Sequence, residues 1–149
     1  MPVVHFAQQD IEVRWMTAKD DAEKALAAGR AGLEQARNMG ADVRKASETL
    51  KEAEKELRLK YFDRSKELSE KGAREVSAAR AVHKQLVDAI YNAETAISKA
   101  RQDGIGIESA ETLLESAVRV RRDAPDRALA LARQAVLELE ESRTRKTIS

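Results

Sequence analysis

Apolar residues recur at intervals of three or four positions along most of the chain, which is the spacing of one face of an α-helix. The first stretch with this spacing contains Val4, Ala7, Ile11, Trp15, Ala18, Ala22, Leu26, Leu33 and Ala36. Four further stretches repeat the pattern, at 43–57, 68–100, 107–117 and 128–139. The pattern therefore predicts an all-α fold of five helices.

Two glycines mark the expected ends of the first and third helices. Gly40 and Gly104 each follow a helical pattern, where a residue in the left-handed conformation commonly ends a helix and glycine adopts it without a steric cost. Asp42 stands where its side chain could cap the second helix. The third helix contains no proline, and Gly72 is its one weak point. We expect a long, continuous third helix; the alternative is a compact bundle in which this helix breaks near Gly72.

Part of the sequence occurs twice. The segment from Leu33 to Ala53 recurs 64 positions later, from Ile97 to Ala117, with matching Ala-Arg, Gly, Val/Ile, Ala, Leu and Ala positions. Such a repeat predicts two similar units of supersecondary structure that stack on each other. We expect an N-terminal helical overhang at 1–17, two three-helix repeats at 18–78 and 79–142 that share the long central helix, and a frayed polar tail at 143–149.

The predicted connectivity resembles that of spectrin-type repeats, in which a shared helix joins successive three-helix bundles, although the units here are shorter. The stretch from Pro125 to Leu139, PDRALALARQAVLEL, also resembles the second helix of tetratricopeptide-like repeats. It lacks their aromatic positions and their period of roughly 34 residues. These resemblances imply a tandem α-helical repeat protein with coiled-coil-like packing, and they indicate no specific family.

The composition narrows the possible partners. Hydrophobic residues make up 42% of the chain but aromatic residues only 3%, so the core must be rich in alanine and other aliphatic residues. The net charge of +1 argues against a dedicated nucleic-acid binder, which usually carries a strong basic excess. No apolar run reaches the roughly 18 residues that a bilayer span requires, and the N-terminus lacks the layout of a secretory signal. We therefore expect a cytoplasmic protein without a membrane partner.

The residues that usually carry chemistry are scarce. The chain has no cysteine, and its two histidines, His5 and His83, lie far apart without a metal-binding spacing. Gly104 and Gly106 precede a helix, but no strand or lysine accompanies them as in a phosphate-binding loop, so they are interpreted as a turn between helices. We predict no catalytic residue, no metal site and no cofactor, and we do not expect an enzyme.

Two basic clusters support an alternative function, the binding of nucleic acid or phosphate. They consist of Arg119, Arg121 and Arg122, and of Arg143, Arg145 and Lys146. In the predicted antiparallel arrangement the clusters lie at opposite ends of neighbouring helices. A solvated helix surface is therefore the favoured interpretation of both.

The strongest functional prediction concerns the start of the first helix. A helix that begins near Pro2 is about twice as long as the second helix, which can cover only its last half. The apolar residues of the overhang then have nothing in the chain to bury them, and exposed apolar stripes mark interaction sites. We predict that Val4, Phe6, Ile11 and Trp15 contact a protein partner or a second copy of the chain. The predicted function is a non-catalytic interaction or scaffold module that forms oligomers through this stripe.

Overall fold

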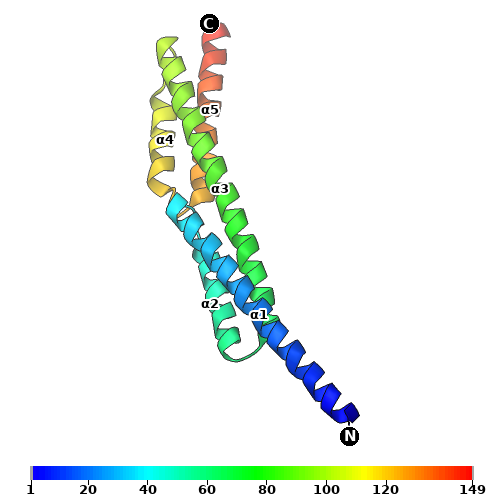
Figure 1. The fold of residues 1–149 in the computed structure, drawn as a ribbon. Coiled ribbons are helices and arrows are strands. Elements are labelled where there is room, and N and C mark those ends of the chain that lie inside the picture. Colours follow the sequence, from blue (N-terminus) through cyan, green and yellow to red (C-terminus); the bar gives the residue numbers. More distant parts are fainter. Residues whose placement is uncertain (1, 149) are drawn as a thin grey trace. The chain divides into compact units, whose positions relative to one another are not determined.

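The computed structural model describes the backbone of residues 2–148 and the side chains of residues 9–148. Of the described residues 89% are helical, and none forms a strand, which confirms the all-α prediction. Five helices follow one another along the chain (Figure 1): α1 (Pro2–Met39), α2 (Arg44–Arg58), α3 (Phe62–Gln102), α4 (Glu108–Val120) and α5 (Pro125–Ile148).

The chain divides into two compact units. The first comprises Met1–Met39 and Val43–Ala79, and the second comprises Gly40–Asp42 and Arg80–Ser149. Helix α3 contributes its N-terminal part to the first unit and its C-terminal part to the second. It runs through Gly72 without interruption, so the alternative of a break at that residue is wrong.

The helix ends follow the predicted glycines. Gly40 and Gly104 have φ angles of +94° and +69°, in the left-handed region. After Gly104, the Ile105 N–H donates a hydrogen bond of 2.9 Å to the carbonyl of Ala100, which satisfies a carbonyl that the end of α3 leaves without a helical partner. The turn between α2 and α3 uses a non-glycine residue instead, Lys60, at a φ of 67°.

The predicted cap of the second helix is wrong. The residue at the N-cap of α2 is Val43, and it makes no side-chain capping hydrogen bond. Ile107 stands at the same place before α4, also without a capping bond. Val43 is buried and Ile107 packs against a core cluster, so each apolar residue turns toward the core at the point where its helix begins. Burial of these side chains therefore decides where each helix begins. Asp42, the predicted cap, lies one residue before the actual N-cap of α2.

In the first unit α1 lies against α2 and the N-terminal part of α3. The buried residues of the first unit are mostly small or aliphatic: Ala22, Leu26, Leu33, Ala36, Val43, Ala46, Leu50, Ala53, Phe62 and Val76. Two serines of α3 are also fully buried. The Ser65 hydroxyl donates a hydrogen bond of 2.8 Å to the carbonyl of Ala53, whereas the Ser69 hydroxyl has no hydrogen-bond partner among the described residues. Small residues at these places let the helices approach closely.

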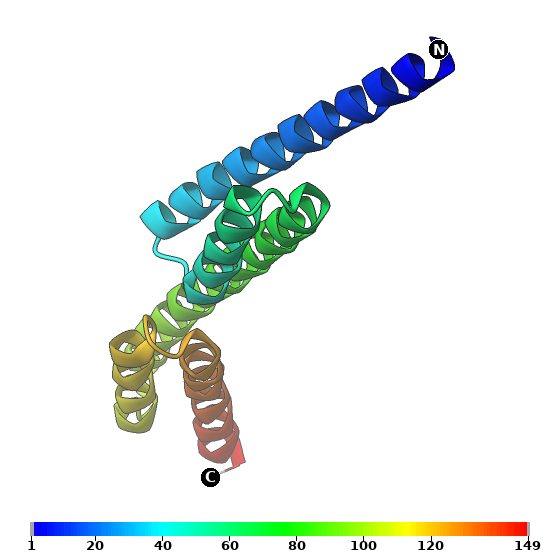
Figure 2. The same ribbon diagram turned by 90° about the horizontal axis from the view of Figure 1, so that it is seen from below.

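In the second unit α4 and α5 lie side by side next to the C-terminal part of α3 (Figures 1 and 2). One buried cluster includes Ile97, Ile105 and Leu139, and another includes Leu86 and Leu129. Several positions matched by the sequence repeat are buried in both units: Ala36 and Ala100, Ala46 and Ala110, Ala53 and Ala117, and Val76 and Leu139. The repeat in the sequence therefore corresponds to a repeated core.

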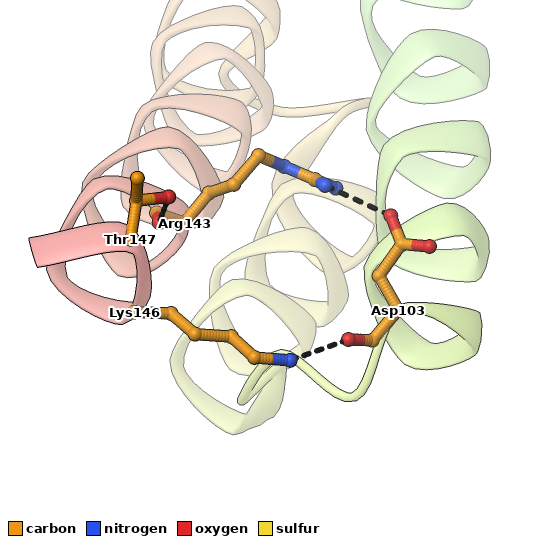
Figure 3. Close-up of polar contacts among 4 residues, drawn as sticks. All are labelled: Asp103, Arg143, Lys146 and Thr147. Atoms are coloured by element: carbon orange, nitrogen blue, oxygen red, sulfur yellow. Dashed lines mark hydrogen bonds and ion pairs between the residues drawn. The ribbon is translucent and has the colours of Figure 1, made fainter. Parts of the chain in front are cut away.

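The C-terminal segment is helical, contrary to the expectation of a frayed tail. Helix α5 continues to Ile148 because two of its basic side chains hold it to the end of α3 (Figure 3). Arg143 donates a hydrogen bond of 2.8 Å to the Asp103 carboxylate, and Lys146 donates one of 2.6 Å to the Asp103 backbone carbonyl. The second contact places a positive charge at the C-terminal end of a helix, where the helix dipole favours it.

Because of this contact, we expect the helicity of the last turns of α5 to depend on pH. The hydrogen bond from Arg143 lowers the pKa of Asp103 below its ordinary value of 3.8. When the pKa of a carboxyl group is lower in the folded state, its stabilising effect is present at pH values above the ordinary pKa. The effect is lost as the pH falls through the lowered pKa of the folded state. We expect the ¹³Cα shifts of residues 143–147 to move toward coil values between about pH 7 and about pH 2. Asp103→Asn should move these ¹³Cα shifts toward coil values already at neutral pH and remove most of their dependence on pH. Identical shifts at about pH 7 and about pH 2 in the unsubstituted protein would contradict the prediction.

Candidate functional site

The N-terminal turns of α1 extend past the turn that joins α2 to α3, as Figure 1 shows in blue. All side chains from residue 9 to residue 17 are exposed. Ile11 is 65% exposed and Trp15 is 48% exposed, although both lie on the helix face that buries Ala22 and Leu26 further along. We call Ile11 and Trp15 the N-terminal stripe. The core-facing side of α1 thus continues beyond the helices that could cover it.

The four predicted contact residues differ in what the structure describes. Ile11 and Trp15 stand four positions apart, one above the other on a single face of α1. The side chains of Val4 and Phe6 lie outside the described residues. Val13 and Met16 are also exposed, but their positions turn away from the stripe.

Trp15 contacts Lys60 of the α2–α3 turn and Phe62, the first residue of α3. Its ring meets that of Phe62 edge-on, with the centroids 5.0 Å apart and the planes at 70°. The Lys60 ammonium lies 5.9 Å from the centre of the Trp15 ring, within the range of a cation–π contact. Phe62 is buried, so one edge of Trp15 belongs to the core while the rest faces solvent. Trp15 therefore marks the boundary between the buried and the exposed part of the α1 face.

A hollow of about 590 Å³ opens beside this tryptophan. Its lining consists of Trp15, Ala18, Glu56, Lys60, Tyr61, Phe62, Asp63 and Arg64. Arg64 and Glu56 form an ion pair of 3.4 Å on its rim. Tyr61 and the neighbouring Leu59 are exposed apolar residues in the turn. The sequence prediction missed these two residues, although two large apolar side chains at a break between helices were a signal for them.

The described residues include few clusters of metal-ligating or titratable side chains. No group of three or more histidine, cysteine or acidic residues in the described part of the chain could hold a metal ion. Two exposed carboxyl groups have displaced pKa values, Glu54 and Asp103, and a hydrogen bond from an arginine lowers each of them. A general acid at neutral pH needs a raised pKa, so both groups are interpreted as surface ion pairs. Among the described helices, none is long and apolar enough to cross a membrane.

The C-terminal basic cluster is engaged within the chain. Arg143 and Lys146 bind Asp103, and Arg145 lies 3.8 Å from Glu141. In the other cluster, Arg119 donates a hydrogen bond of 3.4 Å to Ser116. These contacts give the cations of α5 a role in holding the helix.

No protein-family model, curated protein or solved structure matches the chain.

Proposed function

We propose that the protein is a non-catalytic helical-repeat interaction module that self-associates through the N-terminal stripe. The supporting observation is the continuation of the buried face of α1 into solvent at Trp15 and Ile11. A contiguous exposed apolar face of this kind marks a contact site. The exposed Tyr61 and Leu59 extend the apolar surface beside it.

The charges next to the stripe favour a second copy of the chain as the partner. Residues 10–19 carry two acidic residues, Asp10 and Glu12, followed by two basic residues, Arg14 and Lys19. When two such segments pair antiparallel, the acidic half of each lies beside the basic half of the other, as flanking charges do in coiled coils. Arg14 and Asp10 form an exposed ion pair of 3.0 Å within one helix, which can exchange for the equivalent pair between copies. We therefore propose an antiparallel pair of N-terminal segments.

The expected affinity is modest. Burial of one large apolar side chain contributes about 1.5–3 kcal/mol, and each copy offers Ile11 and the exposed part of Trp15. Association costs about 4–15 kcal/mol in lost freedom of motion. The two terms are of similar size, so the dimer should dissociate at roughly micromolar or higher concentrations.

Replacing Ile11 with glutamate is expected to abolish self-association, because it places a charge in the centre of the proposed contact. Tyr91→Glu is the matched control, since Tyr91 is 66% exposed and lies in the second unit. Light scattering should give a mass that rises with concentration for the unsubstituted chain and for Tyr91→Glu, and the mass of one chain for Ile11→Glu. Circular dichroism should show equal helicity in all three. Association of Ile11→Glu with the strength of the unsubstituted chain would contradict the proposal.

A further inference from the structure

The two units place equivalent leucines differently. Leu50 of α2 is 3% exposed, whereas Leu114, its counterpart in the repeat, is only half-buried on α4. Leu50 fits between the backbones of α1 and α3, at Gly29 and Gly72. A Cβ atom at Gly29 would lie 2.8 Å from Leu50 Cδ2, and one at Gly72 would lie 2.7 Å from the same atom. The first unit therefore buries its leucine in a space that only glycine leaves open.

The second unit has no such space. The counterparts of the two glycines are Ala93 and Ala135, and both are completely buried. A Cβ atom at either glycine of the first unit would clash with Leu50, so we infer that the Cβ atoms of Ala93 and Ala135 keep Leu114 partly outside the core. The replacement of two glycines by alanine thus leaves a large apolar side chain on the surface between α3 and α4.

A second difference keeps this surface open. In the first unit an ion pair between Arg30 of α1 and Glu54 of α2 spans the corresponding helix pair. The hydrogen bond from Arg30 also lowers the pKa of Glu54. The counterparts in the second unit are Glu94 and Val118, which cannot form an ion pair, and Val118 is 40% exposed. The result is a hollow of about 530 Å³ along α3 and α4, lined by Glu94, Ile97, Ser98, Arg101, Glu111, Leu114, Glu115, Val118 and Arg119.

We call this hollow the α3–α4 groove. Its floor is apolar, formed by Ile97, Leu114 and Val118, and its rim is charged. On the rim, Arg101 and Glu111 form an ion pair of 2.5 Å. Two further carboxylates, Glu94 and Glu115, have no ion-pair or hydrogen-bond partner among the residues that the structure describes. The charged lining residues are three acidic (Glu94, Glu111 and Glu115) and two basic (Arg101 and Arg119). The groove thus combines an apolar floor with an excess of one negative charge, and its free carboxylates are those of Glu94 and Glu115.

We propose that the α3–α4 groove binds an amphipathic helix of a partner protein, with basic residues flanking its apolar face. Leucine-sized side chains of this helix would contact Leu114 and Val118, and lysine or arginine side chains would pair with Glu94 and Glu115. Helix α4 has 13 residues and is therefore about 20 Å long, which matches three to four turns of a bound helix. The occupant completes a four-helix arrangement around the second unit, a common way for helices to bury apolar grooves.

The chain's own N-terminal segment fits this groove less well. Residues 10–19 contain equal numbers of acidic and basic residues, so they supply no net positive charge to the carboxylates. The proposed binding site is thus separate from the self-association proposed above. It can be tested in Ile11→Glu, which is expected to be a single chain in solution.

The test uses two synthetic helical peptides of about 15 residues that share one leucine stripe. Lysines flank the stripe in one peptide, and glutamates flank it in the other. Fluorescence anisotropy should show the lysine peptide binding at least about tenfold more tightly than the glutamate peptide, because only the former pairs with the rim. In nuclear magnetic resonance spectra the lysine peptide should shift the signals of Leu114 and Val118. Equal affinity for the two peptides, or no binding of either, would overturn the proposal.

A double substitution that recreates the first unit's ion pair locates the binding. Glu94→Arg with Val118→Glu should weaken binding of the lysine peptide at least about tenfold, because the new ion pair bridges the groove and replaces the free carboxylate of Glu94 with a positive charge. The control is Asp88→Arg with Leu137→Glu, which makes the same change of charge in the separate hollow between α3 and α5. This control should bind like the unsubstituted protein. Unchanged affinity in the first double variant, or an equal loss in the control, would show that the peptide binds elsewhere.

Discussion

Replacing Leu50 with alanine is expected to destabilise the first unit by about 2–5 kcal/mol. Leu50 is almost completely buried, and the backbones at Gly29 and Gly72 touch it from two helices. Loss of the side chain removes this contact and leaves a cavity that helices already in close approach cannot easily close. Urea denaturation followed by the fluorescence of Trp15 reports on this unit, because Trp15 is the only tryptophan and packs on Phe62. The measurement is best made in Ile11→Glu, so that self-association does not contribute.

The matched substitution in the second unit is Leu114→Ala. Because Leu114 is only half-buried, this change should cost clearly less, about 1 kcal/mol. Circular dichroism follows the unfolding of both units, so it can compare the loss of stability caused by Leu114→Ala with that caused by Leu50→Ala. Equal losses for the two leucines would mean that the two cores pack alike, and would contradict the assignment of the α3–α4 groove as an open site.

The effect of Gly72→Ala on the stability of the first unit is expected to depend on the residue at position 50: it should destabilise the unit when Leu50 is present and stabilise it when Leu50 is replaced by alanine. In the presence of Leu50, the new methyl group would lie 2.7 Å from Leu50 Cδ2 and 2.8 Å from Leu50 Cγ. Leu50 cannot move aside because Gly29 confines it from the opposite helix, and overpacking of this kind costs about 1–3 kcal/mol. This cost exceeds the roughly 1 kcal/mol that alanine gains over glycine within a helix. Gly72→Ala should therefore destabilise the otherwise unsubstituted chain.

In the Leu50→Ala background the clash is absent and only the helix preference remains. There Gly72→Ala should stabilise the first unit by about 1 kcal/mol. A double-mutant cycle with denaturation as readout measures the difference directly. If Gly72→Ala has the same effect in both backgrounds, then Leu50 and Gly72 are not coupled and the explanation for the buried leucine is wrong.

The sequence predicted the helices and several of their ends because these depend on local information. The spacing of apolar residues extends over many turns, and Gly40 and Gly104 adopt the left-handed conformation that glycine favours. The start of α2 was predicted incorrectly because the preference of Asp42 for a cap competes with the burial of Val43. The outcome of that competition depends on the neighbouring helices, which the local sequence does not specify.

Contacts between distant residues were the part that sequence patterns could not supply. The contact of Arg143 and Lys146 with Asp103 joins residues 40 or more positions apart, and it made a helix of a segment expected to fray. The contact of Trp15 with Phe62 likewise depends on how far α1 lies along α3. The α3–α4 groove is an intermediate case. Aligning the two repeats sets Gly29 against Ala93, but the consequence for Leu114 becomes visible only when the helices are packed.

We propose that the exposed N-terminal stripe is a contact between two copies of the chain. Sedimentation equilibrium tests this proposal on the full chain and on a variant that lacks residues 1–16, with circular dichroism to verify that both are folded. We predict a mass that rises toward two chains for the full protein and the mass of one chain for the shortened protein. A single-chain mass for both proteins across the micromolar to millimolar range would contradict the claim, as would equal dimer formation by both.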